Sequence, residues 1–228
     1  MKQIIKSIEP ISLTRYRSTI SIENLEDSNI YEDYPNKKRE DCANDVSENI
    51  RKQLLEEQGY ICCYCMSRIN CENSKIEHFK PQTKFRDLQI NYQNLFVACS
   101  GGEGSPNNYQ HCDSKKGEQE LVGINLLTKI ENQIIYNKKS NLIEIDSFNA
   151  NIKQDLKILN LNLQILQKNR KSSYDKVISN LKRKGYSIPN IKKIITFYQS
   201  KNSDKYEPYC EMIVHFLTKK LKSQGATA

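Results

Sequence analysis

The sequence predicts an α+β protein in which a small core stapled by cysteines is flanked by mainly helical extensions. Three observations predict this class. Widely spaced cysteine pairs bracket short apolar segments, a helical pattern precedes them, and apolar residues recur at helical spacing from about residue 148 onward. We therefore expect an N-terminal extension and helix (1–59), the stapled core (60–125) and a hairpin with a basic helical region (126–228).

The positive charge of the chain is concentrated in its second half. The formal net charge is +8, and residues 121–228 alone carry 19 Lys and Arg against 8 Asp and Glu. Such an imbalance is typical of a surface that binds a polyanion, with nucleic acid as the expected partner. An ordinary solvated basic surface explains the same charge equally well.

No segment indicates a membrane span or export. No apolar run approaches the roughly 18 residues that a membrane helix needs, and the segment MKQIIKSIEP lacks the apolar region of a signal peptide. We therefore expect a cytoplasmic protein with no membrane partner. In that reducing compartment, clustered cysteines more often bind metal than form disulfides.

The first 59 residues predict a loop-rich lead-in followed by one helix. Pro10, Pro35 and the polar run 23–29 favour an extended or loop conformation before residue 40. From Asp41 to Gln58 apolar residues recur four apart, and a glycine then ends the pattern. These markers of the helix are Val46, Ile50, Leu54 and Gly59.

The elements between residues 60 and 125 should be short. We expect a cysteine knuckle, a strand around Ile76–Phe79, a loop, and a helix that begins near Cys112. The polar segment 101–110 (GGEGSPNNYQ) is a flexible insertion between two of the cysteines.

The last hundred residues predict a hairpin and then helices. Ile130–Tyr136 and Leu142–Ile145 have strand character and are joined by a polar turn over 137–141. Apolar stripes at helical spacing follow, with Pro189 at the start of a short helix and a last helix over Glu207–Leu221.

Four cysteines have the pattern of a structural metal site. Cys62 and Cys65 form a C-x-x-C pair, whose thiolates can reach one zinc ion from one tight turn. Cys99 and Cys112 are the candidates for the second pair, because the insertion between them can bulge outward while its ends stay close. Four buried, unligated thiols are the alternative interpretation.

The remaining cysteines fit this site less well. Cys63 is separated from Cys65 by one residue, which suits a shared tetrahedral ion poorly, so we assign it to packing, although it remains an alternative ligand. Cys42, Cys71 and Cys210 stand outside the pattern and are expected to be ordinary thiols. Bound zinc would supply folding energy to a segment too short and polar to hold its shape by burial alone.

A second group of residues has the chemistry of phosphodiester hydrolysis. A neutral imidazole such as His78 can take a proton from water, and the carboxylates of Glu77 and Asp113 suit Mg²⁺ or Mn²⁺. Because neighbouring residues on a strand point to opposite faces, Glu77 and His78 can share a site only where the strand twists. Asn94 can hold the backbone of the loop that orients His78.

Each of these residues also has a plainer interpretation. An isolated Glu-His pair is usually structural, and Asn94 suits a turn or cap equally well. Lys116 can contact phosphate or be an ordinary exposed lysine. His111, next to Cys112, can replace Asp113 or bind zinc, but the four thiolates already complete a zinc site.

Taken together, these residues resemble the HNH endonucleases. In that family a Cys-x-x-Cys knuckle, an acidic-His pair, a central Asn and a closing Cys-Asn-x-x-Lys lie in this order on a ββα-metal motif. Here the counterparts read C-C-Y-C, E-H, N-L and C-D-S-K-K. The sequence departs from the family at Glu77, where Asp is commoner, and at Asp113, where Asn or His is usual. Both remain oxygen ligands, so metal preference and rate are what the departures affect.

Four further motifs narrow the resemblance to the PtuB-like nuclease subunits of Septu anti-phage systems and their retron-associated relatives. They are L-x-E-Q-x-x-I-C-x-Y-C (55–65), I-E-H-F-x-P (76–81), H-C-D-x-K (111–115) and L-N-L-N followed by Arg170. The resemblance covers roughly residues 50–170. It implies a PtuA-like ABC-type ATPase as partner and a role in bacterial defence, and the retron relatives imply a reverse transcriptase with its msDNA.

The resemblance thus implies a metal-dependent endonuclease that cuts DNA. Its expected catalytic residues are His78, Glu77, Asn94 and Asp113, with Glu77 and Asp113 on Mg²⁺ or Mn²⁺ and Lys116 on the nucleic acid. Two other functions fit the sequence: a zinc-ribbon adaptor that binds nucleic acid without cutting it, and the same hydrolysis acting on RNA, since no residue recognisably reads a 2′-hydroxyl.

Overall fold

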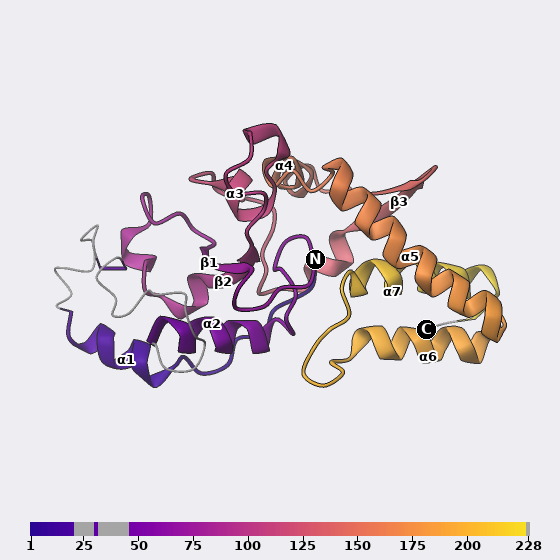
Figure 1. The fold of residues 1–228 in the computed structure, drawn as a ribbon, viewed down its shortest axis with the longest axis horizontal. Coiled ribbons are helices and arrows are strands. Elements are labelled where there is room, and N and C mark those ends of the chain that lie inside the picture. The colour runs from indigo at the N-terminus through magenta and orange to yellow at the C-terminus, as the bar shows by residue number, and fades with distance from the viewer. Residues whose placement is uncertain (21–29, 32–45, 227–228) are drawn as a thin grey trace.

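The computed structural model describes residues 1–20, 30–31 and 46–226 and confirms a mixed α+β architecture with small sheets. The N-terminal helices lie at one end of the molecule and the C-terminal helices at the other, with the first pair of strands and a short helix between them (Figure 1). Within the described residues, no helix is long and apolar enough to cross a membrane.

The N-terminal region contains two helices, α1 (Ile11–Ser18) and α2 (Val46–Glu57). Helix α2 confirms the predicted helix, and its Ile50 and Leu54 are buried. Helix α1 corrects the predicted loop. It buries only Leu13 and so lacks the apolar period that predicts a helix. Pro10 immediately precedes it, a position where a proline is compatible with helix initiation. The expectations for Pro35, for 23–29 and for Asp41 at the start of the predicted helix lie outside the described residues.

The first sheet is an antiparallel pair of β1 (Ser74–His78) and β2 (Leu95–Cys99). Its register pairs Ser74 with Cys99 and His78 with Leu95, so the ends of the two strands coincide. The connection contains two short 3-10 turns, η2 (Arg86–Leu88) and η3 (Tyr92–Asn94). A third, η4 (Asn107–Tyr109), precedes helix α3 (Cys112–Lys116), which packs against β2.

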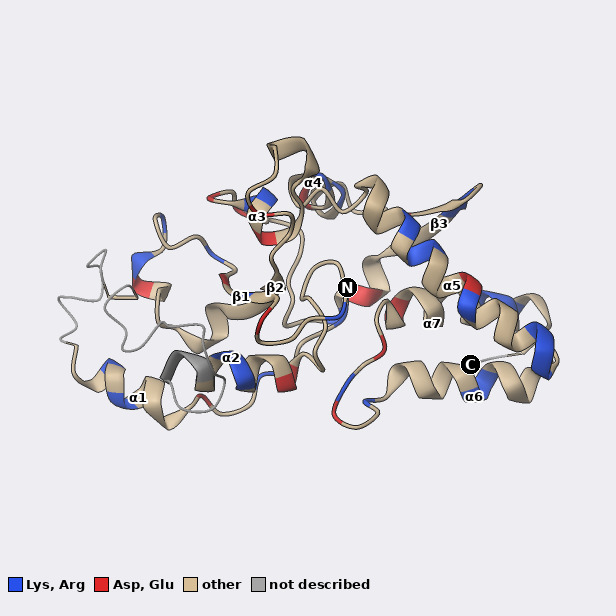
Figure 2. Ribbon diagram, viewed as in Figure 1, with Lys and Arg blue, Asp and Glu red and all other residues tan. Residues whose placement is uncertain are grey.

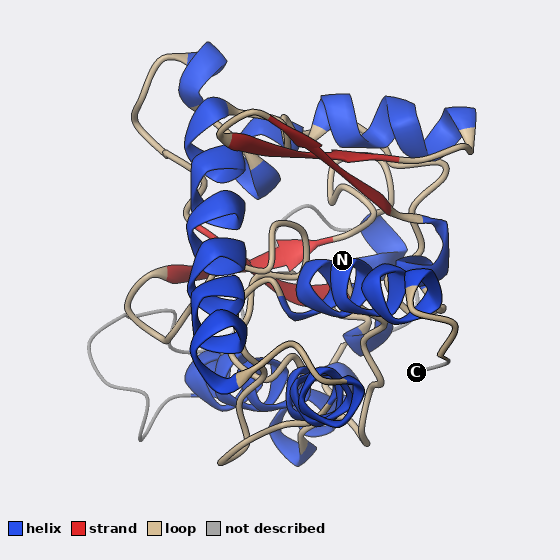
Figure 3. Cartoon of the chain, turned by 90° about the vertical axis from the view of Figure 1, so that its right-hand side faces the viewer, coloured by secondary structure: helices blue, strands red, loops and turns tan. Residues whose placement is uncertain are grey.

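The second sheet is the predicted hairpin with a tighter turn, but its first strand begins at Ile135 and not at the predicted Ile130. A 3-10 turn, η5 (Ile130–Gln133), leads into β3 (Ile135–Lys139), which pairs with β4 (Leu142–Asp146). The polar residues 137–139, expected in the turn, extend β3 because their side chains can face solvent. The turn shortens to two residues, with Ser140 at a positive φ of 46° that such a tight connection favours. Figure 3 shows the two sheets as separate pairs of strands.

Four helices complete the chain and confirm the helical prediction. They are α4 (Ala150–Ile158), α5 (Gln164–Lys184), α6 (Ile188–Gln199) and α7 (Cys210–Ser223). Pro189 stands in the first turn of α6, as expected. Helix α7 begins three residues later than predicted, because Tyr209 adopts a left-handed conformation with φ of 58°.

A buried arginine joins the hairpin to the helices. Arg170 on α5 is 2% exposed, and its guanidinium donates to the carbonyls of Ile143 (2.8 Å) and Leu161 (2.8 Å). Asn162, just before α5, both accepts from the backbone N–H of Ile145 and donates to its carbonyl, at 2.8 and 2.9 Å. The L-N-L-N segment and Arg170 therefore hold β4 in place.

Candidate metal centre and carboxylate site

Three separate elements bring the four predicted cysteines together. Cys62 and Cys65 lie in a tight turn closed by the hydrogen bond from Cys62 N to Ser67 O (2.9 Å). Cys99 ends β2, and Cys112 begins α3. Gln58 fixes the turn to β2, since its amide donates to the carbonyls of Ile61 and Val97 and accepts from Val97 N–H.

The insertion after β2 closes as the spacing predicted. The backbone N–H of His111 donates to the carbonyl of Gly101 (2.8 Å), so the two ends of the loop meet. Gly101 has a positive φ of 57°, and a Cβ there would overlap the carbonyl of His111. Only glycine allows this close approach, which lets Cys99 and Cys112 face the same point.

The four sulfurs have the spacing of a tetrahedral zinc site. They all lie within 4.8 Å of one another, with 3.9 Å between Cys62 and Cys112 and 3.8 Å between Cys65 and Cys99. Four sulfurs placed about 2.3 Å from a central zinc ion would be about 3.8 Å apart. The site therefore fits a metal ion, and its donor set is the one that structural zinc prefers.

Burial and mutual hydrogen bonding shape the chemistry of these thiols. Burial alone would raise the pKa of Cys62, but hydrogen bonds from the neighbouring thiols lower it well below its usual range. The pKa of Cys112 is raised, first by burial and then by its hydrogen bond with Cys62. One thiolate is thus already favoured in the cluster, as a cation-binding site requires.

Cys63 and His111 lie beside the cluster and outside it. The backbone N–H of Cys63 donates to Val97 O (3.2 Å), and burial raises the pKa of its thiol. Nδ1 of His111 lies 3.2 Å from the sulfur of Cys112 and 3.9 Å from that of Cys99. The geometry thus favours four thiolates over either alternative ligand.

Two of the three cysteines outside the pattern lie in the described part of the chain. Cys210 is a free buried thiol, as expected. Cys71 is disulfide-bonded, which corrects the expectation of an ordinary thiol. The turn that carries Cys71 is held against α2, where Nη1 of Arg51 donates to its carbonyl (3.5 Å). Cys42 lies outside the described residues.

Directly beside the cysteine cluster, two carboxyl groups interact. Glu77 on β1 is 2% exposed and forms an ion pair with Lys116 (2.7 Å) on α3. The hydroxyl of Tyr64, which lies between the first two cysteine ligands, donates to the same carboxyl group at 2.7 Å. Burial, then the hydrogen bond and charge of Asp113, raise the pKa of Glu77 well above its usual range.

Asp113 has the opposite shift. Burial alone would raise its pKa, but the hydrogen bond with Glu77 and the charge of Lys75 lower it. The ammonium group of Lys75 lies 2.8 Å from Asp113, 3.3 Å from Glu103 and 3.2 Å from the hydroxyl of Ser114. The opposite shifts favour one shared negative charge on the Glu77–Asp113 pair, which suits a pair of oxygen ligands for a divalent cation.

Lys116 is buried, whereas a residue that contacts nucleic acid was expected to be exposed. Its side chain is 2% exposed, and its ammonium group donates to the carbonyl of His78 (2.9 Å) as well as pairing with Glu77. It therefore links the carboxyl pair to the end of β1 from inside the protein. The lysine type was visible in the sequence, but its burial was not.

The His78 ring contacts the loop that follows β1. Nε2 lies 2.8 Å from the carbonyl of Gln89, and Nδ1 lies 2.8 Å from the amide nitrogen of Gln82. Tyr31 packs edge-on against the ring with centroids 4.4 Å apart. These contacts fit a neutral ring that donates from Nε2 and accepts at Nδ1. Glu77 contacts α3 instead, as alternation along a strand predicts.

Asn94 makes the backbone contacts expected of it. Its side chain accepts from Lys80 N–H (2.7 Å) and donates to the carbonyls of Lys80 (3.1 Å) and Leu88 (3.2 Å). The N–H of Phe79, the residue after His78, donates to Asn94 O (2.9 Å). Asn94 thus holds both ends of the loop that surrounds the His78 ring.

Sequence reasoning missed several residues that build this site. Tyr64 and Lys75 touch the carboxyl pair, and Gln82 covers the imidazole. Asn160 donates to the carbonyls of Asn108 and Gln110, which fixes the insertion from the C-terminal side. Tyr64 carried one usable signal, its position between two cysteine ligands.

Comparison with known proteins gives one partial match. No family model matches the chain. The Septu protein PtuB of Bacillus thuringiensis is 30% identical to it over 73 residues, which make up 31% of this chain and 24% of that protein. The chain thus covers about a quarter of the relative's length. This is a similarity to a Septu protein. Beside this partial similarity, the chain has a cluster of four cysteines that is able to bind a metal ion.

Proposed function

We propose that this protein is a metal-dependent endonuclease of the HNH type, in which Cys62, Cys65, Cys99 and Cys112 hold a structural zinc ion. The order of the elements supports this assignment, because an antiparallel strand pair is followed by a short helix that carries the last thiol and the second carboxyl. DNA is the proposed substrate.

One observation carries the proposal: the buried carboxyl of Glu77 contacts the partly exposed carboxyl of Asp113, directly beside the thiol cluster. Two carboxyl groups in hydrogen-bonding contact raise each other's energy unless a proton or a cation lies between them. Hard oxygen ligands suit Mg²⁺ or Mn²⁺. Lys75 and Lys116 now neutralise these oxygens, so they must yield part of that contact when a divalent ion enters.

The chain's own residues then have distinct parts in hydrolysis. A bound divalent ion supplies electrophilic polarisation of the phosphate. Glu77 and Asp113 hold that ion, and Asn94 keeps the loop around His78 in place. His78 is the proposed base, taking the proton of the attacking water at Nδ1 with Nε2–H anchored on Gln89 O. Gln82 must release Nδ1 before this step, because its amide occupies that nitrogen. The ring of His78 faces the loop after β1 whereas Glu77 faces α3, so the end of β1 must turn before both residues can serve one phosphate.

The nuclease proposal is tested by nicking of plasmid DNA with Mg²⁺ or Mn²⁺. Glu77→Gln and Asp113→Ala should each lower the rate at least about 100-fold, because each removes a charged oxygen ligand of the metal. Glu103→Gln is the matched control, since Glu103 also contacts Lys75 but its side chain is 57% exposed and outside the pair. It should retain most of the activity.

Folding must be separated from catalysis in this test. Glu77→Gln leaves the Lys116 charge buried, so zinc content and thermal melting are measured for every variant. Asp113→Ala is the cleaner variant, because its carboxyl is less enclosed (21% side-chain exposure). Full cleavage by a folded Asp113→Ala protein would overturn the proposed role of the carboxyl pair.

A specific observation also favours a second candidate, a zinc-ribbon adaptor that binds nucleic acid without cutting it. Both carboxyl groups contact lysines, and both ring nitrogens of His78 have hydrogen-bond partners. Such an adaptor needs the zinc site but neither Glu77 nor His78. It would bind plasmid DNA and leave it intact with every divalent metal, alone and with its partner.

The proposed partners come from the resemblance to PtuB-like proteins. They are a PtuA-like ABC-type ATPase and, in a retron setting, a reverse transcriptase with its msDNA. Cleavage assays with and without the ATPase test whether the nuclease is restrained by it. Parallel assays on RNA decide between the two substrates, because the same hydrolysis attacks either backbone.

A further inference from the structure

One segment carries charge equal to the net charge of the whole chain. Residues 164–200, which contain α5 and α6, hold nine Lys and Arg against a single Asp, and the chain as a whole carries +8. The remainder of the sequence is therefore balanced. Blue segments recur along α5 in Figure 2, and Arg170 is the one of these cations on α5 that the fold buries.

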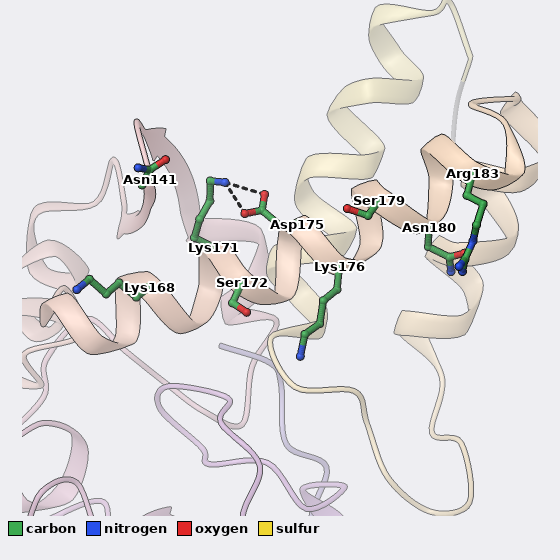
Figure 4. Close-up of a pocket in the computed structure, with 9 residues that line it drawn as sticks. All are labelled: Asn141, Lys168, Lys171, Ser172, Asp175, Lys176, Ser179, Asn180 and Arg183. Carbon is green, nitrogen blue, oxygen red and sulfur yellow. Dashed lines mark hydrogen bonds and ion pairs between the residues drawn. The ribbon is translucent and has the colours of Figure 1, made fainter.

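Four cations of α5 line one groove. Its lining includes Lys168, Lys171, Lys176 and Arg183, at helical spacings that keep them on neighbouring rows of the same side (Figure 4). Fifteen residues separate the first from the last, which corresponds to about 22 Å of helix. The groove is shallow, with a volume of about 690 Å³.

The lining contains no apolar side chain. The cations are separated by small polar groups that can donate hydrogen bonds, including Ser172, Ser179 and Asn180. The core of a typical protein–protein interface is apolar and rich in aromatic residues, whereas phosphate oxygens are bound by lysine, arginine, serine and asparagine. The chemistry of the groove thus favours a phosphate backbone over an acidic protein surface.

The fold holds like charges together at this groove. Lys138 on β3 lies over the ring of Tyr174 (3.8 Å), and its pKa is lowered first by burial and then by the charge of Lys171. The one acid, Asp175, pairs with Lys171 at 2.6 Å. A bound polyanion would relieve the remaining repulsion between these cations.

We propose that the groove along α5 binds the phosphate backbone of a nucleic acid, over about six or seven base pairs of a duplex at about 3.4 Å per pair. The inference extends the proposed nuclease function by adding a second contact to the substrate. The start of α5 is tied to the metal centre through the backbone, because Arg170 donates to Leu161 O and the carbonyl of Leu159, two residues earlier, accepts from Cys112 N–H. In this proposal a nucleic acid at the carboxylate site continues along the helix.

The test measures binding alone, by fluorescence anisotropy of labelled 20-base-pair DNA and RNA duplexes with the zinc-loaded full chain and no added Mg²⁺ or Mn²⁺. The triple variant Lys168→Gln, Lys176→Gln, Arg183→Gln should raise Kd at least about tenfold at about 100 mM salt. The plot of the logarithm of the association constant against the logarithm of the salt concentration has a negative slope, and its magnitude should decrease by about 2 to 3 in this variant. The two duplexes show which backbone is preferred.

The matched control removes the same charge elsewhere. Lys52→Gln, Lys129→Gln, Lys157→Gln affects three exposed lysines outside the groove and should change Kd less than about threefold. Asp175→Asn, which removes the groove's only acid, should tighten binding about twofold. All the substituted side chains are exposed, and thermal melting confirms that each variant is folded.

Two results would overturn the inference: an equal loss of affinity in the two triple variants, or unchanged binding in the groove variant. If the groove variant instead lost an acidic protein partner, the groove would be a protein-binding surface and the inference wrong. Cleavage is assayed separately. A protein that never cuts but loses binding with the groove variant would refute the nuclease proposal alone.

Discussion

At the scale of single residues, Lys6 shows how a buried charge is tolerated beside the core of the site. Its side chain is 3% exposed, and its ammonium group lies 4.4 and 4.5 Å from the ring centroids of Tyr92 and Phe96. Glu57 is 3.5 Å away. Burial lowers the pKa of Lys6 to about 8, and Glu57 offsets only part of that effect.

This shift predicts how stability depends on pH. Between pH 8 and 10.5 the folded protein has lost the Lys6 proton while the unfolded chain keeps it, so the free energy of unfolding should rise with pH across that window. Relative to Lys6→Met, the wild type should gain up to about 3 kcal/mol from pH 8 to 10.5. Denaturant unfolding of both proteins at several pH values measures this difference.

Titratable groups other than Lys6 are present in both proteins, so their effects largely cancel in the difference between the free energies of unfolding of wild type and Lys6→Met. Glu57 keeps its hydrogen bonds from Tyr92 and Ser7 in the variant, so its contribution should change little across this range. A difference that stays flat or falls as pH rises would show that the folded pKa of Lys6 is not lowered.

Residue types with strong chemistry were predictable from the sequence, and their surroundings were not. The four thiolates of the cluster follow from spacing, because two cysteines in one turn can reach one ion. The burial of Lys116 and the cover that Gln82 places on His78 depend on contacts 38 and 4 residues away in the chain. A single sequence holds no signal for such pairs.

At the scale of elements, the thiol cluster joins a turn, the end of β2 and the start of α3. Such short elements have little surface to bury, so the metal should supply much of their stability. We expect the purified protein to contain one zinc per chain. Cys62→Ala and Cys99→Ala should each lose that zinc and lower the melting temperature, by zinc analysis and thermal melting.

Cys63→Ala is the matched control for this prediction. Cys63 is as buried as the ligands and next to Cys62, but its sulfur stands outside the group of four. Zinc content near one per chain should persist, with only the modest destabilisation of a small buried substitution. Loss of zinc from this variant, with retention in Cys62→Ala, would show that the ligand assignment is wrong.

Element boundaries were predictable where one rule decides them. The hairpin and α6 follow from alternation and from Pro189, whereas α1 was missed because it buries one residue and shows no period. The polar end of β3 was assigned to the turn because solvent-facing strand residues resemble loop residues. Hydrogen-bonded pairing with β4 makes these residues part of the strand, and the sequence alone does not reveal that pairing.

At the scale of the whole molecule, the C-terminal helices help to build the metal centre. The backbone N–H of Cys112 donates to Leu159 O (2.9 Å), at the end of α4. Tyr209, before α7, donates its backbone N–H to Met66 O (3.1 Å), and its hydroxyl lies 2.9 Å from that of Ser67. Both ends of the thiol cluster are thus fixed by residues beyond 125.

These contacts lead us to propose that the predicted divisions, 1–59, 60–125 and 126–228, are parts of one folding unit. The full chain should melt in a single transition whose midpoint rises with zinc. The fragment 1–125 should bind zinc weakly and melt without cooperativity, because removing Leu159 and Tyr209 leaves the backbone of Cys112 and Met66 without these partners. Calorimetry of chain and fragment decides this. Two separate transitions in the full chain, with the fragment reproducing one of them, would contradict this proposal. A fragment can melt cooperatively only if the contacts that stabilise it lie within the fragment, so the core would then be an independent domain.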